Sequence, residues 1–382
     1  MDIFKFVTPE IIFGRNSLDQ IGASAARLGA RKVFVASDPG VLEAGWAGKA
    51  VEIIKGAGLE HCLWTGITPN PKDCEIEEGV GIYRSENCDA VLALGGGSVI
   101  DAAKAVALMA TNGGTIQQYE GIGKVHSPLP PLVAVPTTAG SGAEVSQFSI
   151  IVDVERKIKM TIISKSLVPD IAIVDSGILG TKSSELTANT GMDVLTHAVE
   201  AYTSVAATPL TDVQALNSIR LIARSLRKSV ASKTDLVAKE EMAMASLQAG
   251  IAFSNAILGA VHAITHQLGG LLDMPHGEAN AILLPHVMRF NLIAALERYA
   301  EIAEAFGESS LGTSKRAMAE KAISAVEELA EDIGISPSLS AVGLQEEHIP
   351  ELSKNAIHDA CLITNPRDMT RAQIEKLLKE AL

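Results

Sequence analysis

The chain has 382 residues, a length that exceeds one ordinary hydrophobic core and predicts two or three domains. Apolar residues make up 47% and charged residues 20%, which excludes bulk disorder and a small disulfide-stapled scaffold. The formal net charge is −13 and the basic residues form no dense run, so nucleic acid is not an expected partner.

The first part of the chain alternates short β-branched runs with helical stretches. In chain order, strands are expected at 32–37, 90–94, 132–136 and 171–175, and helices at 42–56 and 99–110. Two further runs, 148–152 and 157–163, are separated by a short polar segment and predict a β-hairpin. Such alternation is typical of βαβ units, so this part predicts a Rossmann-like parallel sheet with an appended hairpin.

Beyond about residue 180 the apolar positions lie three and four apart, which predicts helices rather than strands. The expected helices are 188–204, 210–230, 236–255, 257–272, 276–290, 293–306, 314–334 and 370–381. The sequence therefore predicts an α/β domain over residues 1–180 and an all-α domain over residues 181–382.

The four cysteines, Cys62, Cys74, Cys88 and Cys361, lack a C-x-x-C pair and the tight spacing of a disulfide framework, so we expect reduced thiols. The charged N-terminus does not resemble a signal peptide, and no window reaches about eighteen uninterrupted apolar residues. We therefore expect a cytoplasmic protein without a membrane partner.

Two glycine-containing loops follow predicted strands. Gly95 to Ser98 opens the helix at 99–110, where glycines let the backbone approach an anion and the helix N-terminus offers N–H groups to a phosphate. The loop lacks G-x-G-x-x-G spacing and a Walker lysine, so a plain strand-to-helix turn is an equal alternative. A second loop of small and hydroxyl residues, Pro136 to Glu144, makes a nucleotide site the favoured interpretation.

A carboxylate, Asp38, follows the first predicted strand. At that edge of a sheet it could accept hydrogen bonds from ribose hydroxyls, and its charge would repel a 2′-phosphate. If the site binds a dinucleotide, Asp38 predicts NAD rather than NADP. A helix N-cap or turn aspartate is an equally open interpretation.

Five of the nine histidines lie between residues 197 and 286. Asp193 and His197 are four residues apart, as are His262 and His266, and side chains at this spacing share a helix face. His276 begins the next predicted helix. Any one histidine is best explained as structural, but one carboxylate grouped with several imidazoles suits Fe²⁺ or Zn²⁺ rather than Mg²⁺ or Ca²⁺.

At these residues the sequence resembles the iron-containing, or group III, alcohol dehydrogenases, a branch of the dehydroquinate-synthase-like fold. The resemblance covers essentially the whole chain. It rests on IIFG at 11–14, TPNP at 68–71, GGGSVID at 95–101, PTTAGSGAEVS at 136–146, GMDVLTHAVEAY at 191–202, HAITHQLGG at 262–270, PHGEANAILLPHVMRFN at 275–291 and CLITNPR at 361–367.

The resemblance implies roles for individual residues. The implied metal ligands are Asp193, His197, His262 and His276, with His266 near the nicotinamide but not bound to the metal. The implied substrate pocket includes Phe253 and Cys361. The implied NAD-binding residues are Asp38, Asn70, Gly96, Gly97, Ser98, Thr137, Thr138, Ser146, Phe148, Lys159 and Ile178. Two positions depart from the family pattern: residue 146 is serine where threonine is common, and residues 175–179 lack the usual proline and place Ile178 at the usual leucine.

These observations predict an NAD-linked, metal-dependent alcohol dehydrogenase, with Fe²⁺ bound and Zn²⁺ as the alternative. Its expected substrate is a small neutral primary alcohol or diol, interconverted with the aldehyde, because the helices around the ligands carry apolar side chains: Ala252, Phe253, Ile257, Leu258, Ala260 and Val261. His266 is the expected proton relay. The resemblance implies a homodimer formed through the strand region around Ile11 to Gly14, or a higher assembly of such dimers. The alternatives are a glycerol or polyol dehydrogenase, another dehydroquinate-synthase-like enzyme, and a non-catalytic metal- or nucleotide-binding homologue.

Overall fold

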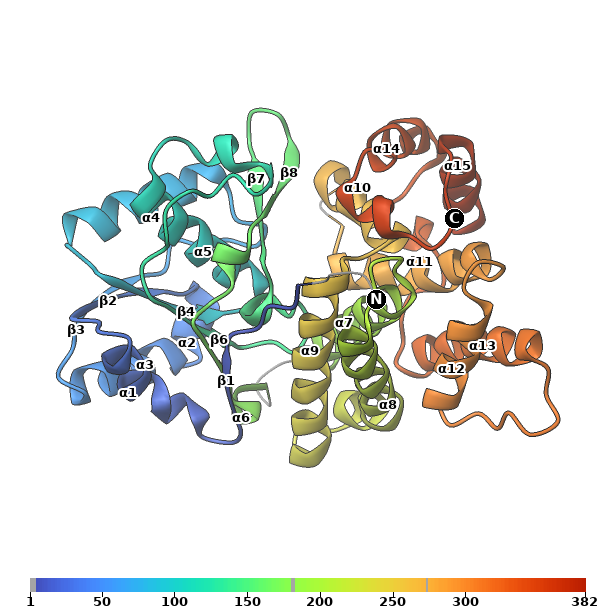
Figure 1. Ribbon diagram of the computed structural model, residues 1–382, viewed down its shortest axis with the longest axis horizontal. Coiled ribbons are helices and arrows are strands. Elements are labelled where there is room, and N and C mark those ends of the chain that lie inside the picture. Colours follow the sequence, from blue (N-terminus) through green and yellow to red (C-terminus); the bar gives the residue numbers. More distant parts are fainter. Residues whose placement is uncertain (1–4, 180–182, 273) are drawn as a thin grey trace. The chain divides into compact units, whose positions relative to one another are not determined.

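The computed structural model describes residues 5–179, 183–272 and 274–382. The chain divides into two compact units, Val7–Thr181 and Lys182–Leu382, the latter together with Met1–Phe6. Within the described ranges all strands belong to the first unit, whereas the second is built of helices (Figure 1). The predicted fold class, an α/β domain followed by an all-α domain, is confirmed.

A six-stranded parallel sheet lies at the centre of the N-terminal unit. Its strands, in spatial order, are β1 (Glu10–Phe13), β9 (Ile171–Val174), β6 (Leu132–Pro136), β4 (Ala90–Gly95), β2 (Lys32–Ala36) and β3 (Glu60–Trp64). A smaller sheet contains β5 (Gly121–Ile122), β8 (Ile158–Ile163) and β7 (Phe148–Asp153). β7 and β8 pair antiparallel, which confirms the predicted hairpin.

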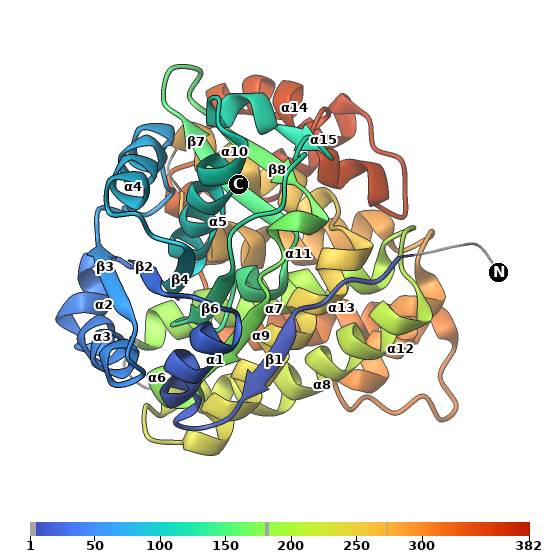
Figure 2. The same ribbon diagram turned by 60° about the vertical axis from the view of Figure 1, so that its left-hand side comes forward.

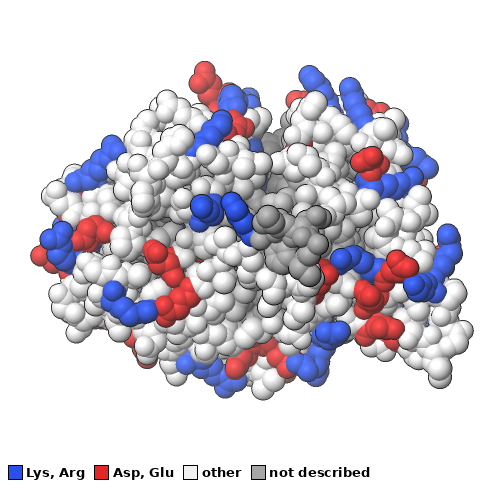
Figure 3. Space-filling model, in the orientation of Figure 1, with Lys and Arg blue, Asp and Glu red and all other residues white. Residues whose placement is uncertain are grey.

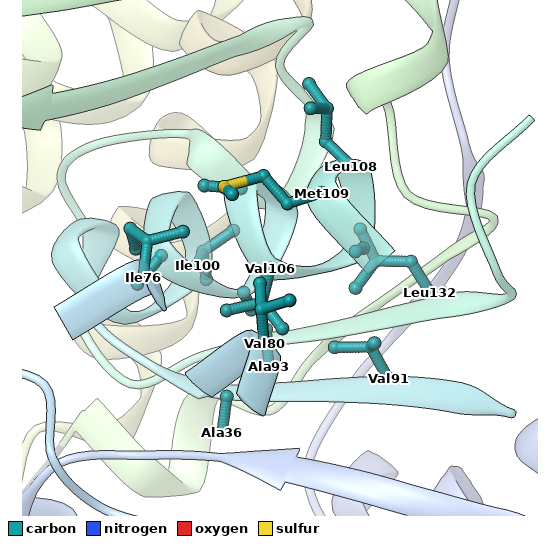
Figure 4. Packing of buried hydrophobic residues seen from close by; sticks show 14 of the residues in the cluster. Ala36, Ile76, Val80, Val91, Ala93, Ile100, Val106, Leu108, Met109 and Leu132 are labelled. Carbon is teal, nitrogen blue, oxygen red and sulfur yellow. The ribbon is translucent and has the colours of Figure 1, made fainter. Parts of the chain in front are cut away.

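The helices of this unit are α1 (Ile21–Arg27), α2 (Pro39–Glu43), α3 (Trp46–Gly56), α4 (Asp73–Ser85), α5 (Gly97–Asn112) and α6 (Ser176–Leu179). Figure 2 shows α1 and α3 on one side of the large sheet and α4 and α5 on the other. Alternate residues of each inner strand therefore enter different cores. Phe34 packs in the cluster under α4 and α5, while its neighbour Val35 packs in the opposite one. Figure 4 shows Val80 and Val106 meeting Ala93 in the first cluster.

Burial on both faces explains why the inner strands appear in the sequence as uninterrupted apolar runs. The edge strand β3 is different, because Glu60 and Leu63 are exposed. This mixed pattern is the reason that the sequence analysis did not predict β3.

The helical unit contains α7 (Ser184–Thr203), α8 (Pro209–Ala231), α9 (Leu236–Ala256), α10 (Ala260–Leu272), α11 (His276–Asn291), α12 (Leu296–Ala305), α13 (Lys315–Asp332), α14 (Ile349–Ala356) and α15 (Arg371–Glu380). α7 is the central helix, and every residue from Gly191 to Thr203 is buried. It contacts α8, α9, α11 and α12. Because the middle of α7 is enclosed, its polar side chains must find partners inside the unit.

The helix predicted at 257–272 begins three residues later than expected. Ile257 ends α9 with a φ of 62°, a conformation that a β-branched residue rarely adopts and that interrupts the helical path. α9 and α10 consequently meet at an angle of 101°. No single helix among the described residues is long and apolar enough to cross a membrane, although this bent pair passes that test of length and composition together.

Candidate metal centre and glycine loops

Four side chains of the helical unit converge on one carboxylate oxygen. Asp193 and His197 extend from α7, His262 extends from α10, and His276 is the first residue of α11. The Oδ1 atom of Asp193 lies 3.9 Å from Nε2 of His197, 3.7 Å from Nε2 of His262 and 3.9 Å from Nε2 of His276. The structure thus brings together the four residues expected to bind a metal.

This donor set fits a divalent transition metal. One ion with bonds of roughly 2.0–2.2 Å holds its donor atoms about 3–4 Å apart, which is the separation seen between Asp193 and each histidine. Burial opposes ionisation of Asp193, but the nearby histidines outweigh it and hold the pKa of this carboxyl well below its usual range. The site therefore presents a fixed negative charge and imidazole nitrogens to a cation.

A close helix contact sets the position of His276. A Cβ atom added at Gly277 would lie 2.4 Å from the carbonyl oxygen of Asn189, closer than real Cβ atoms come to backbone. Glycine at this position lets the start of α11 approach α7 directly. The amide of Asn280, one turn along α11, donates to Oδ1 of Asp193 at 2.7 Å and so joins the two helices at the carboxylate.

Glu200 is a buried carboxylate that the sequence analysis did not identify. Its Oε2 atom lies 2.6 Å from Nδ1 of His262, and its Oε1 accepts the backbone N–H of Val261 at 2.7 Å. Burial disfavours the charged imidazole, yet the nearby carboxylates of Asp193 and Glu200 raise the pKa of His262 to about 9. Glu200 therefore holds Nδ1 of His262 and turns Nε2 toward Asp193. It lies three residues after His197 on α7, a spacing that could have revealed it.

The bend before α10 makes room for Glu200. A Cβ atom at Gly259 would lie 2.8 Å from Oε1 of Glu200, so a larger residue there would displace the carboxylate from the start of the helix. The first backbone N–H groups of α10 have no partner within the helix, and a carboxylate there is favoured by the helix dipole. The amide oxygen of Asn365 accepts the N–H of Ala260 at 3.2 Å and completes this N-terminal cap.

His266 lies one turn beyond His262 but faces a different partner. Its Nδ1 atom is 3.0 Å from Oδ2 of Asp359, and its ring centre lies 6.0 Å from that of His262. Asp359 begins the 3₁₀ helix η7 (Ala360–Thr364) and also accepts the backbone N–H of Cys361 at 2.9 Å. Burial opposes ionisation of Asp359, but His266 counters it, and the pKa of Asp359 is lowered. Sequence reasoning missed Asp359, which lies far along the chain.

The two residues expected in the substrate pocket also lie in this region. The ring of Phe253 stacks on His197 with 4.5 Å between ring centres. Cys361 is buried, and burial raises the pKa of its thiol well above the usual value. An apolar ring thus covers one side of the histidine cluster, and an uncharged thiol lies beside Asp359.

In the N-terminal unit the two predicted loops meet at the carboxyl ends of β4 and β6. A Cβ atom at Gly97 would lie 2.8 Å from the side chain of Ser141, and one at Gly96 would lie 3.5 Å from Thr138. The Thr137 N–H donates to the carbonyl of Gly95 at 2.9 Å. Glycine is required at residue 97 because the side chain of Ser141 packs directly against its backbone.

Three other expected cofactor residues lie at or near these loops. The N–H of Asn70 donates to the hydroxyl of Ser98 at 3.3 Å. Asp38 lies just after β2 and caps α2, accepting the N–H of Val41 at 2.9 Å through Oδ1. The N-cap interpretation of Asp38 therefore holds, and a contact of its other carboxylate oxygen with ribose stays a prediction.

A buried lysine fixes another part of this region. Nζ of Lys104, on α5, donates to the carbonyl and hydroxyl of Ser146 at 2.7 and 3.0 Å and to the carbonyl of Phe148 at 2.9 Å. Burial lowers the pKa of Lys104 and raises those of Asp101 and Glu144, which face it. Lys104 was not identified from sequence, although the one basic residue in the otherwise largely apolar α5 is a visible signal.

The last two expected cofactor residues belong to other elements than the two loops. Lys159 is on β8, paired with Val152 of β7, and Ile178 lies in α6, fully buried in the core beside α1 and α3.

Over the face drawn in Figure 3, basic and acidic side chains are interspersed, so neither positive nor negative charge forms a continuous patch there.

The family is shown by comparison with known proteins. Residues 8–176 match the model for "Iron-containing alcohol dehydrogenase", and residues 187–382 match that for "Fe-containing alcohol dehydrogenase family, C-terminal". The chain is 44% identical to 1,3-propanediol dehydrogenase of Klebsiella pneumoniae over 382 residues, covering 99% of each chain. It is 42% identical to NAD-dependent methanol dehydrogenase of Bacillus methanolicus over 377 residues, again covering 99% of each chain.

A solved structure of 1,3-propanediol oxidoreductase, 44% identical, superimposes with a TM-score of 0.98 over 100% of both chains. Together with the matched family models and the full-length relatives, this likeness covers both units. The chain belongs to the iron-containing alcohol dehydrogenase family and is an oxidoreductase of that type.

Proposed function

We propose that this protein is a metal-dependent dehydrogenase that interconverts a small neutral primary alcohol or diol with its aldehyde, using NAD. The observation that carries the proposal is the convergence of His197, His262 and His276 on Asp193. These four residues would hold the metal, which we propose to be iron, with zinc as the alternative because imidazole and carboxylate bind both ions.

NAD is the proposed cofactor because two small-residue loops meet at the carboxyl ends of parallel strands, where nucleotides bind in open α/β sheets. Gly96, Gly97 and Ser98 would contact the pyrophosphate at the start of α5. Lys104 would keep Ser146 in place for the nicotinamide half. The methanol dehydrogenase relative carries NAD dependence in its name, which supports the same choice here.

The proposed substrate is small and neutral. Phe253 covers the histidine cluster with an aromatic ring, and the neighbouring residues of α9 and α10 are apolar and buried. Such walls disfavour a phosphorylated or carboxylated substrate, because burying its charge without a partner is costly. The relatives named for 1,3-propanediol and methanol support a short alcohol or diol.

The chemistry requires the alcohol to lose a hydroxyl proton and a hydride, the latter to the nicotinamide. A bound divalent metal supplies Lewis acidity, which lowers the pKa of an alcohol hydroxyl. The residues of the chain then have separate tasks. Asp193 and the three histidines fix the position of the ion, and Glu200 orients His262. His266 receives the hydroxyl proton. Because Asp359 engages Nδ1 of His266, the exchange falls to Nε2.

A substrate panel on metal-defined protein tests this function. Chelated protein is reloaded with Fe²⁺ or Zn²⁺, and NADH formation is followed with ethanol, butanol, 1,3-propanediol and glycerol. We expect turnover with a short alcohol or diol, loss of turnover on chelation and recovery on reloading. Bound metal with no turnover on any substrate would contradict the proposal and favour a non-catalytic binding protein.

We also propose that the protein is a cytoplasmic homodimer. β1 (Glu10–Phe13) is an edge strand of the six-stranded sheet, so one of its sides can pair with a second copy of the chain. The four free cysteines support a reducing compartment. Sedimentation of the Ile11→Pro variant tests the dimer, because the N–H groups of Glu10 and Gly14 bond to β9 and that of Ile11 therefore faces the free edge. We expect a monomer, and an unchanged mass would contradict pairing through β1.

A further inference from the structure

A second group of metal-binding side chains lies beside the first. His266 on α10, and Asp359 and Cys361 at the start of η7, offer ligand atoms that all lie within 4.8 Å of one another. His266 and Cys361 are buried, and the side chain of Asp359 is only 12% exposed. The group shares no residue with Asp193, His197, His262 and His276.

The backbone and hydrogen bonds hold these three side chains together. Asp359 Oδ2 is 3.0 Å from His266 Nδ1, while its Oδ1 accepts the N–H of Cys361. The Sγ atom of Cys361 lies within 4.8 Å of the ligand atoms of both Asp359 and His266. A carboxylate that lies between an imidazole and a thiol already has the neighbours that a shared cation needs, so little reorganisation is required.

The donor types select a particular class of ion. Sulfur and imidazole favour borderline or soft cations such as Zn²⁺ and Cd²⁺, whereas Mg²⁺ and Ca²⁺ prefer oxygen alone. Three protein ligands leave a fourth position to water, as in open zinc sites. The Asp193 cluster contains no sulfur, so the two sites differ in the ions they prefer and in the spectra they give.

We propose that His266, Asp359 and Cys361 form a second metal site, selective for a soft or borderline divalent cation such as Zn²⁺ or Cd²⁺, that is filled when such an ion is in excess. On binding, the S–H bond of Cys361 is replaced by a sulfur–metal bond, and the thiol proton passes to solvent. Neutral His266 gives one ring nitrogen to the ion and keeps its proton on the other. No electron is transferred.

Occupation of this site inhibits the enzyme, a consequence that rests on the proposed function. An ion held by His266 removes the residue that receives the hydroxyl proton, and it places a second positive charge beside the first metal. Excess zinc should therefore suppress alcohol oxidation in protein that already holds one equivalent of metal, and a weak chelator should restore the activity.

The site can be tested without measuring activity. Protein preloaded with one equivalent of Zn²⁺ is titrated with Cd²⁺, and the ultraviolet absorption band of a cadmium–thiolate bond is recorded together with the amount of metal bound. Exchange of Cd²⁺ into the Asp193 cluster gives no such band, because that cluster has no sulfur. We expect the wild-type protein to develop the band as it takes up a second equivalent of metal.

Three variants make the result specific. Cys361→Ser should lose the band, and Asp359→Asn, which keeps the sulfur, should bind Cd²⁺ at least about tenfold more weakly. Cys74→Ser, which changes an exposed cysteine of the other unit, should behave as the wild type. A band that persists in Cys361→Ser, a band that disappears in Cys74→Ser, or uptake of one equivalent only would overturn the proposal.

The outcome also separates this site from the proposed function. Absence of turnover with every alcohol, together with a cadmium band that depends on Cys361, would reject the dehydrogenase function and support the second site. Normal turnover, together with no cadmium–thiolate band in the wild-type protein, would support the dehydrogenase function and reject the second site.

Discussion

The glycine loops of the N-terminal unit and the histidine cluster of the helical unit place their functional atoms by different physical means. At the loops, the functional surface is backbone, and its shape depends on glycines whose missing Cβ atoms let Gly97 and Ser141 touch. At the cluster, the functional atoms are side chains, and buried carboxylates such as Glu200 hold them in orientation. Steric changes should therefore damage the glycine loops, whereas changes of charge or hydrogen bonding should damage the histidine cluster.

The largest loss of metal binding and turnover is expected from a change at Asp193, on which the three histidines converge. Asp193→Asn removes the charge that faces His197, His262 and His276 and replaces it with an amide that binds metal poorly. We expect bound iron, measured by elemental analysis, and turnover to fall more than about 100-fold. NAD affinity should not change. Asp332→Asn, an exposed aspartate of the same unit, is the control, and full metal content in Asp193→Asn would refute the ligand assignment.

Removal of the residue proposed to receive the hydroxyl proton should leave the metal bound. His266→Ala removes the residue held by Asp359 without touching Asp193, so turnover should fall by about 100-fold or more while metal content stays the same. Asp359→Asn should reduce turnover less and displace the pH profile of kcat, since an amide no longer holds the ring nitrogen as a carboxylate does. Loss of iron along with His266 would show that this histidine is a ligand instead.

Glu200→Gln tests the supporting carboxylate at the cluster. The amide oxygen can still accept the N–H of Val261, but its NH₂ group faces Nδ1 of His262 and opposes the present hydrogen bond. We expect metal affinity, measured by competition with a chelator, to fall roughly 10- to 100-fold with the fold retained. Glu304→Gln, which changes an exposed glutamate of α12, is the control outside the cluster. An unchanged affinity in Glu200→Gln would show that its role is limited to capping α10.

A steric change tests the loops in the opposite unit. Gly97→Ala places a methyl group 2.8 Å from Ser141, so the loops must move apart, and we expect the KM for NAD to rise about tenfold with full metal content. The double variant Gly97→Ala with Ser141→Gly removes the clash and should recover most of the affinity. Gly81→Ala, where a Cβ meets nothing within 4 Å, should leave the KM unchanged. Failure of the double variant to recover would indicate a cause other than crowding.

The smallest effect concerns the choice between NAD and NADP. Asp38→Gly removes the charge near the expected ribose and also the side-chain cap that Asp38 gives to α2, so a stability loss of roughly a few tenths of a kcal/mol is expected. We expect NADP to be accepted severalfold better relative to NAD. Asp38→Ser keeps a capping oxygen without the charge and should show the same change of preference with less loss of stability. If NADP affinity stays constant in both variants, Asp38 has only the capping role.

Much of the helical site was visible in the sequence because a helix turns side chains four residues apart to one face. This rule paired Asp193 with His197, and it would also have revealed Glu200 had the face been followed one turn further. Asp359 could not be found in this way. It lies 93 residues from His266, and only the packing of η7 against α10 brings the two together.

The two loops were predicted as separate segments, but the contact between them was not predicted. Strands β4 and β6 are neighbours in the sheet, and this order places Gly97 against Ser141. Nothing local in either segment encodes that order. The start of α10 was misplaced for a related reason: the apolar sequence favours a helix from residue 257, whereas the contacts of Glu200 and Asn365 require α10 to begin at Ala260.

The central claim is that one metal ion is held by Asp193, His197, His262 and His276. Anomalous X-ray diffraction at the iron absorption edge, from crystals of protein loaded with one equivalent of Fe²⁺, tests it most directly. The structure predicts a single strong peak within bonding distance, about 2.0–2.3 Å, of Asp193 Oδ1 and the three Nε2 atoms. A peak at any other group of residues, or none in protein that oxidises alcohol with NAD, would contradict it.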